Sequence, residues 1–250
     1  MLAALIWPAQ STAAVDALLQ GQFAMKGTVT RADNVQGEHK GQSVKRKWRF
    51  DSKCGPAPYC ESVVLHRERA KHRVDKLTLK RTGVGSYSGK GKFRFSLRCG
   101  GRVYKHGGEA RVKISLKITA STTVQGVPFA TNVTATYSNP RRINHTQCGG
   151  DLGRDGASYT GKIKSQPTPP SAAFDVSGPP ARKVSFTDRS KRGSEHSPIA
   201  TRSWDFGDGS TASGRNPSHT YTTAGPYTVT ETVTDENGLV DTAMKQIVVS

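Results

Sequence analysis

The chain has 250 residues, 34% of them hydrophobic, and a formal charge of +18 at pH 7. This length allows one or two domains with a core, and the composition is not polar enough to predict a disordered chain. The charge is unevenly distributed, since residues 1–165 hold 29 Lys and Arg against 10 Asp and Glu, whereas residues 166–250 hold 8 against 9. The shift predicts two domains with different roles, and the basic one is expected to attract polyanions.

Residues 1–21 are predicted to be a signal segment with a truncated start. A short apolar stretch is followed by small residues, of which Ser11 and Ala13 fit the −3 and −1 positions of a signal-peptidase site. The basic residues that open a signal peptide are missing, so the alternatives are a start placed too late or an ordinary first helix. The apolar run is shorter than the ~20 residues of a membrane span. The expected location is therefore secreted or cell-surface.

The cysteine content supports export. An even number of cysteines in a polar, loop-rich exported domain predicts two disulfides. The short spacing of the first two predicts a local loop closed at its base, which leaves the other two as the second pair. Zinc is disfavoured because no C-x-x-C or H-x-x-x-H pair accompanies them, and neither a metal nor another cofactor is expected. The cysteines are Cys54, Cys60, Cys99 and Cys148.

Residues 22–165 are predicted to form a basic, disulfide-bonded all-β domain. Apolar and charged side chains alternate over residues 76–80, 92–98 and 111–118, and glycine-rich breaks separate these runs. Such a period of two places one set of side chains in a core and the other in water. Eight or nine antiparallel strands are expected, which predicts an antiparallel β-barrel or sandwich. We recognise no family for this part of the chain.

Residues 166–170 are predicted to be a linker. Three of these five residues are proline, which fixes φ and lacks an N–H, so the segment is expected to be an extended, semi-rigid spacer. It would separate the basic domain from a second folded unit that begins at Ser171.

Residues 171–250 contain the sequences WDFGDGS at 204–210, NPSHTY at 216–221 and AGPYTVT at 224–230. In order and spacing, these motifs resemble the PKD family, named after the polycystic kidney disease protein. The resemblance implies an immunoglobulin-like β-sandwich. It also implies a role in protein or carbohydrate contacts of secreted and cell-surface proteins, rather than a reaction. The motif residues are Trp204, Asp205, Phe206, Gly207, Asp208, Gly209, His219, Tyr221 and Tyr227.

The residues of this motif also have a structural explanation of their own. Trp204 and Phe206 lie two positions apart and therefore share the face of a strand that packs between two sheets. The glycines on both sides of Asp208 suit a chain reversal. Asp205, Asp208 and His219 are interpreted as turn and cap residues, because a surface turn cannot separate the pKa values of two carboxylates as catalysis requires.

The alternating runs of the basic domain predict a surface of cations. If Phe93, Phe95 and Leu97 point inward, as the apolar residues of 111–118 also would, the intervening cations point to solvent. If the two strands are neighbours, these cations form one ladder that binds a polyanion; the alternative is a face whose charge only prevents aggregation. The candidate polyanion-binding residues are Lys92, Arg94, Arg98, Arg111, Lys113 and Lys117.

These observations predict a non-catalytic extracellular binding or adhesion protein. The basic domain would dock on an anionic envelope polymer, and the PKD module would contact protein or polysaccharide. No GxSxG, HExxH or P-loop motif occurs, so no enzyme activity is expected. Two alternatives are an accessory module of a secreted hydrolase system and a lipocalin-like barrel that encloses a small ligand. Nothing in the sequence marks a pocket, and residues 67–73 are expected to be a solvated strand end and turn.

Nucleic acid is a disfavoured partner. Trp48, Phe93, Phe95 and Tyr104 could form an exposed stacking platform of the kind that binds single strands. Their alternation with cations is instead what buried aromatic residues show, and an exported protein seldom meets nucleic acid. The sequence does not predict the oligomeric state.

Overall fold

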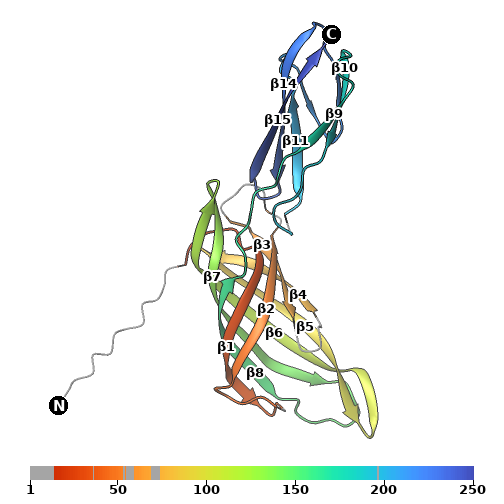
Figure 1. Cartoon of the computed structure of the whole chain (residues 1–250). Helices are drawn as coiled ribbons and strands as arrows, with labels where there is room; N and C mark the ends of the chain where they lie inside the picture. The colour runs from red at the N-terminus through yellow and green to blue at the C-terminus, as the bar shows by residue number, and fades with distance from the viewer. Residues whose placement is uncertain (1–13, 36, 53, 55–58, 69–73, 196) are drawn as a thin grey trace, which may run out of the picture.

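The computed structural model describes residues 14–35, 37–52, 54, 59–68, 74–195 and 197–250. These parts of the chain contain β-strands and no α-helix, and hence no helix long and apolar enough to cross a membrane. Figure 1 shows two β-domains arranged end to end: strands β1–β8 form the first, and β9–β15 form the second. The predicted signal-peptidase positions lie outside the described residues.

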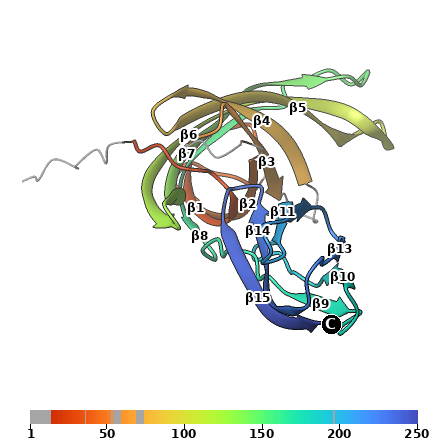
Figure 2. The same cartoon turned by 90° about the horizontal axis from the view of Figure 1, so that it is seen from above.

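The first domain is one antiparallel sheet of eight strands in sequence order. β1 also pairs with β8, from Phe23 opposite Ile163 to Asp33 opposite Arg154, so the two edges of the sheet meet. The closure is uneven, because only three residue pairs join β4 to β5, and Figure 2 shows β4 and β5 spreading away from the ring. The domain is therefore a wide, curled sheet rather than a uniform barrel or a two-layer sandwich. Its strands are β1 (Gly21–Asp33), β2 (Ser43–Ser52), β3 (Ser62–Glu68), β4 (Val74–Gly83), β5 (Ser86–Cys99), β6 (Arg102–Val124), β7 (Val127–Asn144) and β8 (Arg154–Ile163).

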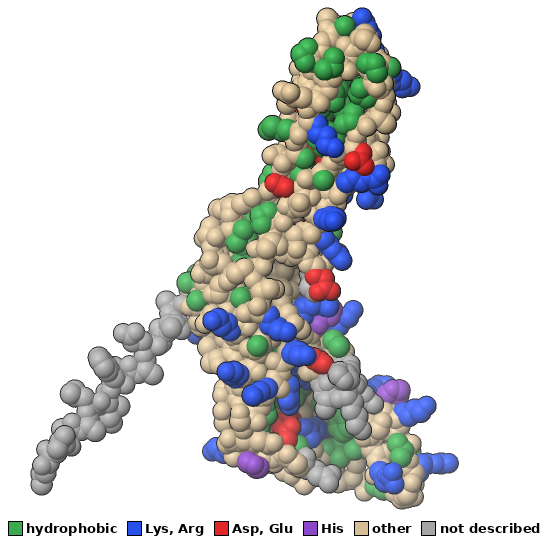
Figure 3. Space-filling model, in the orientation of Figure 1, with side chains coloured by type: hydrophobic (Ala, Val, Ile, Leu, Met, Phe, Trp, Pro, Cys, Tyr) green, Lys and Arg blue, Asp and Glu red, His purple; other side chains and the backbone are tan. Residues whose placement is uncertain are grey.

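The predicted alternation of side chains is confirmed along these strands. In β6, Val112, Ile114 and Leu116 are buried inside the sheet, while Arg111 and Lys113 are exposed outside it. The interior is well filled at the end next to the second domain. At the far end, which is the lower end in Figure 3, the surface is hollowed and hydrophobic and charged side chains show inside. The interior of the first domain is thus filled at one end and hollow at the other.

The segment before β1 closes the filled end. Ala17, Leu18 and Leu19 are fully buried in the core of this domain, and Leu18 forms a parallel bridge with Phe129. Asp16 accepts hydrogen bonds from Arg81 and, at 2.8 Å, from the amide of Gly85. The folded domain therefore begins before Gln22, so the predicted boundary at residue 21 was placed too late.

Both disulfides have the expected partners. Cys54 is bonded to Cys60 with Cα atoms 5.2 Å apart, and Cys99 is bonded to Cys148 with Cα atoms 5.7 Å apart. The first closes a loop between β2 and β3. The second joins the end of β5 to the loop between β7 and β8, so it holds the long β5–β6 hairpin to a distant part of the sheet. By chain entropy, the longer loop contributes about 4 kcal/mol to stability and the shorter about 2 kcal/mol.

The second domain is a sandwich of two sheets, as predicted. One has the order β13-β10-β9 and the other β12-β11-β14-β15. Between them, Phe174, Phe186, Trp204 and Phe206 form a run of aromatic contacts with ring centres 5.1–6.2 Å apart. The strands are β9 (Phe174–Ser177), β10 (Lys183–Asp188), β11 (Ile199–Asp205), β12 (Thr211–Ser213), β13 (Ser218–Thr220), β14 (Gly225–Asp235) and β15 (Val240–Val249).

The proline-rich linker packs against the sandwich and is not a free spacer. The amide of Thr168 donates to Ser194 Oγ at 3.0 Å, and Pro170 is buried. A Cβ atom at Gly193 would lie 1.9 Å from the carbonyl oxygen of Pro169, so only glycine allows this approach. The sequence correctly predicts an extended segment here. The contacts that fix it come from residues more than twenty positions later.

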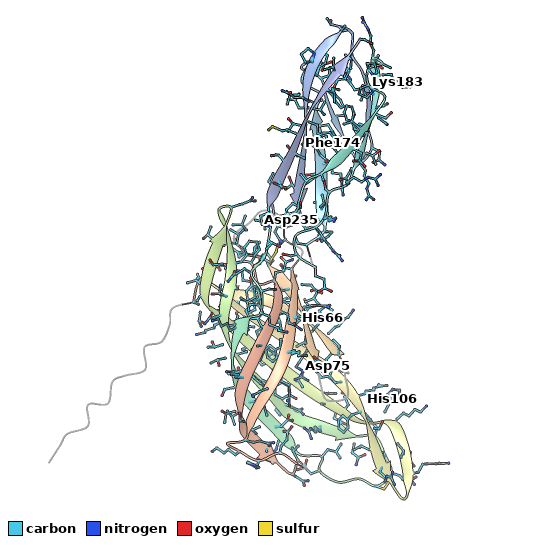
Figure 4. All side chains as sticks on the ribbon, viewed as in Figure 1. His66, Asp75, His106, Phe174, Lys183 and Asp235 are labelled. Carbon is cyan, nitrogen blue, oxygen red and sulfur yellow. A yellow bond between two sulfur atoms is a disulfide. The ribbon has the colours of Figure 1, made fainter. Side chains whose placement is uncertain are left out.

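The two domains also contact each other directly. Leu239, in the turn between β14 and β15, is fully buried in the hydrophobic core of the first domain. Next to it, the side chain of Gln125 in the β6–β7 turn donates to Val240 O at 2.8 Å and accepts from Val240 N at 2.7 Å. Asp235, which Figure 4 shows at this junction, accepts the amide of Leu239 at 2.9 Å and so orders the turn. The two domains are therefore held together by direct contacts as well as by the segment that links them.

Candidate functional site

The topology brings most of the predicted cations together. β5 and β6 are neighbours, with Lys92 opposite Arg111 and Lys90 opposite Lys113. β7 follows β6, and Arg141 lies opposite Arg111. Like charges therefore face each other across three strands, and all of these charged side chains are exposed. We call this set the cationic surface, and it consists of Lys90, Lys92, Arg94, Arg111, Lys113, Lys117 and Arg141.

One predicted residue lies outside this set. Arg98 pairs with Val103, four residues beyond Arg94 and after a bulge between Phe95 and Leu97. It is exposed near the end of the β5–β6 hairpin, with Arg102 and Lys105. Five of the six predicted residues are thus neighbours, and Arg98 belongs to a separate basic hairpin end.

Lys90 and Arg141 are not predicted from the sequence. Lys90 lies between Gly89 and Gly91, and these glycines predict a break although β5 runs through them. Continuing the period of two backwards from Lys92 would have found it. Arg141 faces Arg111 only because the pairing of β6 with β7 shifts between Arg111 and Lys113. The sequence carries no comparable signal for that bulge.

Glu109 lies at the edge of the cationic surface. It is opposite Arg94 in register, and Arg111 Nε donates to its Oε1 at 3.1 Å. The hydrogen bond from Arg111 lowers the pKa of Glu109 and, with the charge of Lys92, outweighs the effect of partial burial. Glu109 is therefore ionised at neutral pH, and it offsets only part of the positive charge around it.

The aromatic residues proposed as a stacking platform are not arranged as one. Trp48 is fully buried in the core, with its ring centre 5.2 Å from that of Tyr159. Phe93 and Phe95 point into the same interior and pack against the core. The outer face of β5 and β6 therefore presents cations, while Phe93 and Phe95 are inside and Tyr104 is half-buried near the end of the β5–β6 hairpin.

In the second domain, the motif residues hold the two sheets together. Trp204 is buried, and its indole N–H donates to Gly214 O at 2.9 Å. The hydroxyl of Tyr221, also buried, donates to Phe206 O at 3.1 Å. The hydroxyl of Tyr227 donates to Thr223 O at 2.9 Å. Trp204 and Tyr221 thus fill the core, Tyr227 packs against it, and the polar atom of each is satisfied.

The acidic motif residues belong to the turn between β11 and β12. Asp205 accepts the amide of Gly207 at 2.8 Å, and Asp208 accepts the amide of Ser210 at 2.9 Å. The φ angles of Gly207 and Gly209 are +80° and +87°, which suit glycine. These carboxylates therefore accept hydrogen bonds within the chain reversal.

His219 completes this turn. Its Nε2 lies 2.7 Å from Asp208 Oδ2, and its ring stacks on Phe206 with centres 4.3 Å apart. Partial burial acts to raise the pKa of Asp208, but the hydrogen bonds from His219 and Ser210 outweigh it, so the pKa is lowered. The histidine packs against the sandwich core through its ring.

Comparison with known families gives a match to the PKD domain over residues 164–249. Residues 164–249 are a PKD domain. The match includes the proline-rich segment that packs on the sandwich. It leaves residues 1–163 outside.

The chain is also similar to individual proteins, two of which are solved PKD domains. Over 47 residues, 19% of this chain, the sequence is 49% identical to a microbial collagenase of Vibrio alginolyticus, and this stretch covers only 6% of the collagenase. The PKD1 domain of Vibrio anguillarum Epp is 34% identical, covering 34% of this chain and 98% of that one, with a TM-score of 0.32. The PKD1 domain of the Vibrio cholerae metalloprotease PrtV is 35% identical, covering 33% and 99%, with a TM-score of 0.31.

Proposed function

We propose that this protein is a non-catalytic extracellular binding protein whose first domain binds an anionic polymer of the cell envelope through the cationic surface. The observation that carries the proposal is the alignment of Lys92, Arg111 and Arg141 across three neighbouring strands. Like charges directly opposed across strands are destabilising. A polyanion laid across the strands would remove that repulsion, and it would meet several cations at once.

The location and the absence of catalysis are supported by separate features. Two disulfides fit an oxidising compartment outside the cytoplasm. In the PKD domain, the turn between β11 and β12 uses the side chains of Asp205, Asp208 and His219 for its own hydrogen bonds. They therefore do not offer a pair of carboxylates in a cleft. The match to part of a collagenase favours an accessory module of a secreted protein. The PKD domain would contact protein or polysaccharide while the basic domain anchors the molecule.

We expect the protein to be retained on a heparin column at low ionic strength and to elute at moderate salt, because screening weakens exposed charge contacts. The triple variant Lys92→Ser, Arg111→Ser, Lys113→Ser should elute at clearly lower salt. A matched control, Lys45→Ser, Lys76→Ser, Lys162→Ser, changes the net charge equally on β2, β4 and β8, and it should elute close to the wild type.

Two results would count against this function. If the wild type failed to bind heparin at low salt, a polyanion would be excluded as the ligand of the first domain. Equal shifts in the two triple variants would show that net charge alone, not the cationic surface, retains the protein.

A further inference from the structure

The hollow end of the first domain contains a cavity of about 530 Å³, a size typical of small-ligand sites. It lies inside the curled sheet, at the end far from the PKD domain (Figure 3). Its walls are aromatic on several sides: Phe93, Phe95, Tyr137 and Tyr159 all line it. A Cβ atom at Gly108 would lie 2.3 Å from the ring of Phe95, so the lack of a side chain at Gly108 leaves room for this ring.

Arg67 enters this cavity between two aromatic rings. Its guanidinium carbon lies 5.2 Å from the ring centre of Phe93 and 4.6 Å from that of Tyr137. Its Nη2 donates to Asp75, labelled in Figure 4, at 3.0 Å, and only 12% of the side chain is exposed. The expectation of a solvated strand end is therefore wrong at Arg67, because its position in the period of two is an interior one; residues 69–73 lie outside the described residues.

Two residues that line the cavity each carry a buried polar atom that lacks a partner among the described residues. Arg67 Nε is a donor, and Asn139 Oδ1 is an acceptor. Asn139 is fully buried, and its Nδ2 donates to Asp155 Oδ1 at 2.7 Å. An unsatisfied buried polar atom costs about 1–3 kcal/mol. Both atoms are covered by their neighbours in this structure, so a molecule in the cavity reaches this donor and this acceptor only when the side chains around them move.

The charges around these two atoms are largely paired. Arg67 bonds Asp75, and Arg142 Nη2 donates to Asp155 Oδ1 at 2.7 Å. Arg46 and Glu38, of opposite charge, also line the cavity. Burial raises the pKa of Tyr137 to about 12, so its hydroxyl is neutral at physiological pH. The cavity is thus suited to an uncharged ligand.

We propose that this cavity binds a neutral, hydroxylated apolar ring compound, whose ring packs among the aromatic walls and whose hydroxyl accepts from Arg67 Nε and donates to Asn139 Oδ1. A single hydroxyl group has one donor hydrogen and two acceptor lone pairs, so it satisfies both atoms when it lies within hydrogen-bond distance of each. The site is on the inside of the sheet and the cationic surface is on the outside. The inference therefore does not depend on polymer binding.

The probe for this site is 2-naphthol, titrated into the full chain and followed by its own fluorescence anisotropy. We expect saturable binding of one molecule per chain. Asn139→Leu should weaken 2-naphthol binding about tenfold, while leaving 2-methoxynaphthalene, which cannot donate a hydrogen bond, unchanged. Ala157→Phe, which fills the cavity from its wall, should abolish the binding of both probes. Unfolding curves establish that each variant is folded.

Three results would overturn the proposal. Absence of saturable 2-naphthol binding would remove the site, and binding that survives Ala157→Phe would place it elsewhere. Tighter binding of the anion 2-naphthoate than of 2-naphthol would contradict an uncharged ligand. If Asn139→Leu does not fold, Ala157→Phe and the comparison of the three probes on the wild type still decide the question.

Discussion

Replacing Glu231 by Gln is expected to stabilise the PKD domain at pH 8 by about 3 kcal/mol. Glu231 is fully buried on β14, its Oε1 lacks a partner among the described residues, and Ser190 Oγ lies 3.3 Å from its Oε2. Burial and the charge of Asp188 raise the pKa of Glu231 from 4.5 to about 7. Above pH 7 the folded domain must hold an ionised carboxylate in this place, whereas glutamine stays neutral.

The pH dependence of the wild type follows from the sign of this shift. The pKa of Glu231 is higher in the folded state, so its contribution to stability is fully present below pH 4.5 and is lost as the pH rises through about 7. Asp188 acts at lower pH: burial raises its pKa, but hydrogen bonds from Ser190 and Arg202 outweigh this, so the pKa is lowered. Its contribution is lost only as the pH falls below its usual range, outside the window of Glu231.

Hydrogen exchange of the β11 and β14 amides, measured from pH 5 to 8 after correction for the intrinsic rates, follows the PKD domain separately from the first domain. Wild-type protection should decrease across this range, and in Glu231→Gln it should stay nearly constant. Glu236→Gln, at an exposed position of the neighbouring turn, is the matched control and should behave like the wild type. Wild-type protection that increases toward pH 8 would contradict the assignment.

The second large effect is expected from Leu239→Asp. Burial of a leucine contributes about 2–3 kcal/mol, and a carboxylate in the same place would be buried without a partner. Because Leu239 belongs to the PKD domain but packs in the core of the other domain, the expected result is separation of two folded domains. Small-angle X-ray scattering should show a larger radius of gyration, while circular dichroism stays that of a β protein.

A control for this variant is Val248→Asp, on β15. Val248 is 61% exposed, so its replacement should leave the scattering curve unchanged. If Leu239→Asp also leaves the curve unchanged, the domains are not held together by this side chain.

The features that the sequence predicted are those with a local signal. Alternation in 111–118 placed Val112 and Ile114 inside and Lys113 outside because each strand residue determines its own face. The motif from Trp204 to Tyr227 gave the sandwich because its turn glycines and its core aromatics lie close together in the chain. The spacing of Cys54 and Cys60 gave one disulfide and, by elimination, the other.

The features that the sequence did not predict depend on residues far apart in the chain. Leu18 resembles the end of a signal segment, and its burial depends on pairing with Phe129. In the sequence, Leu239 is indistinguishable from an ordinary turn residue, because its burial depends on contact with the other domain. The cavity was missed because Arg67 and Asn139 are polar at interior positions, and an interior polar residue is identified only once its neighbours are known.

In the proposed function, an anionic polymer contacts the outer face of β5 and β6. Lysine acetylation of the wild-type protein, with and without heparin, tests this contact when the acetylation of each site is quantified by mass spectrometry. We predict that heparin protects Lys90, Lys92, Lys113 and Lys117, while Lys45 and the PKD residue Lys183 react as before. Equal protection of all these lysines, or protection of none, would contradict the claim.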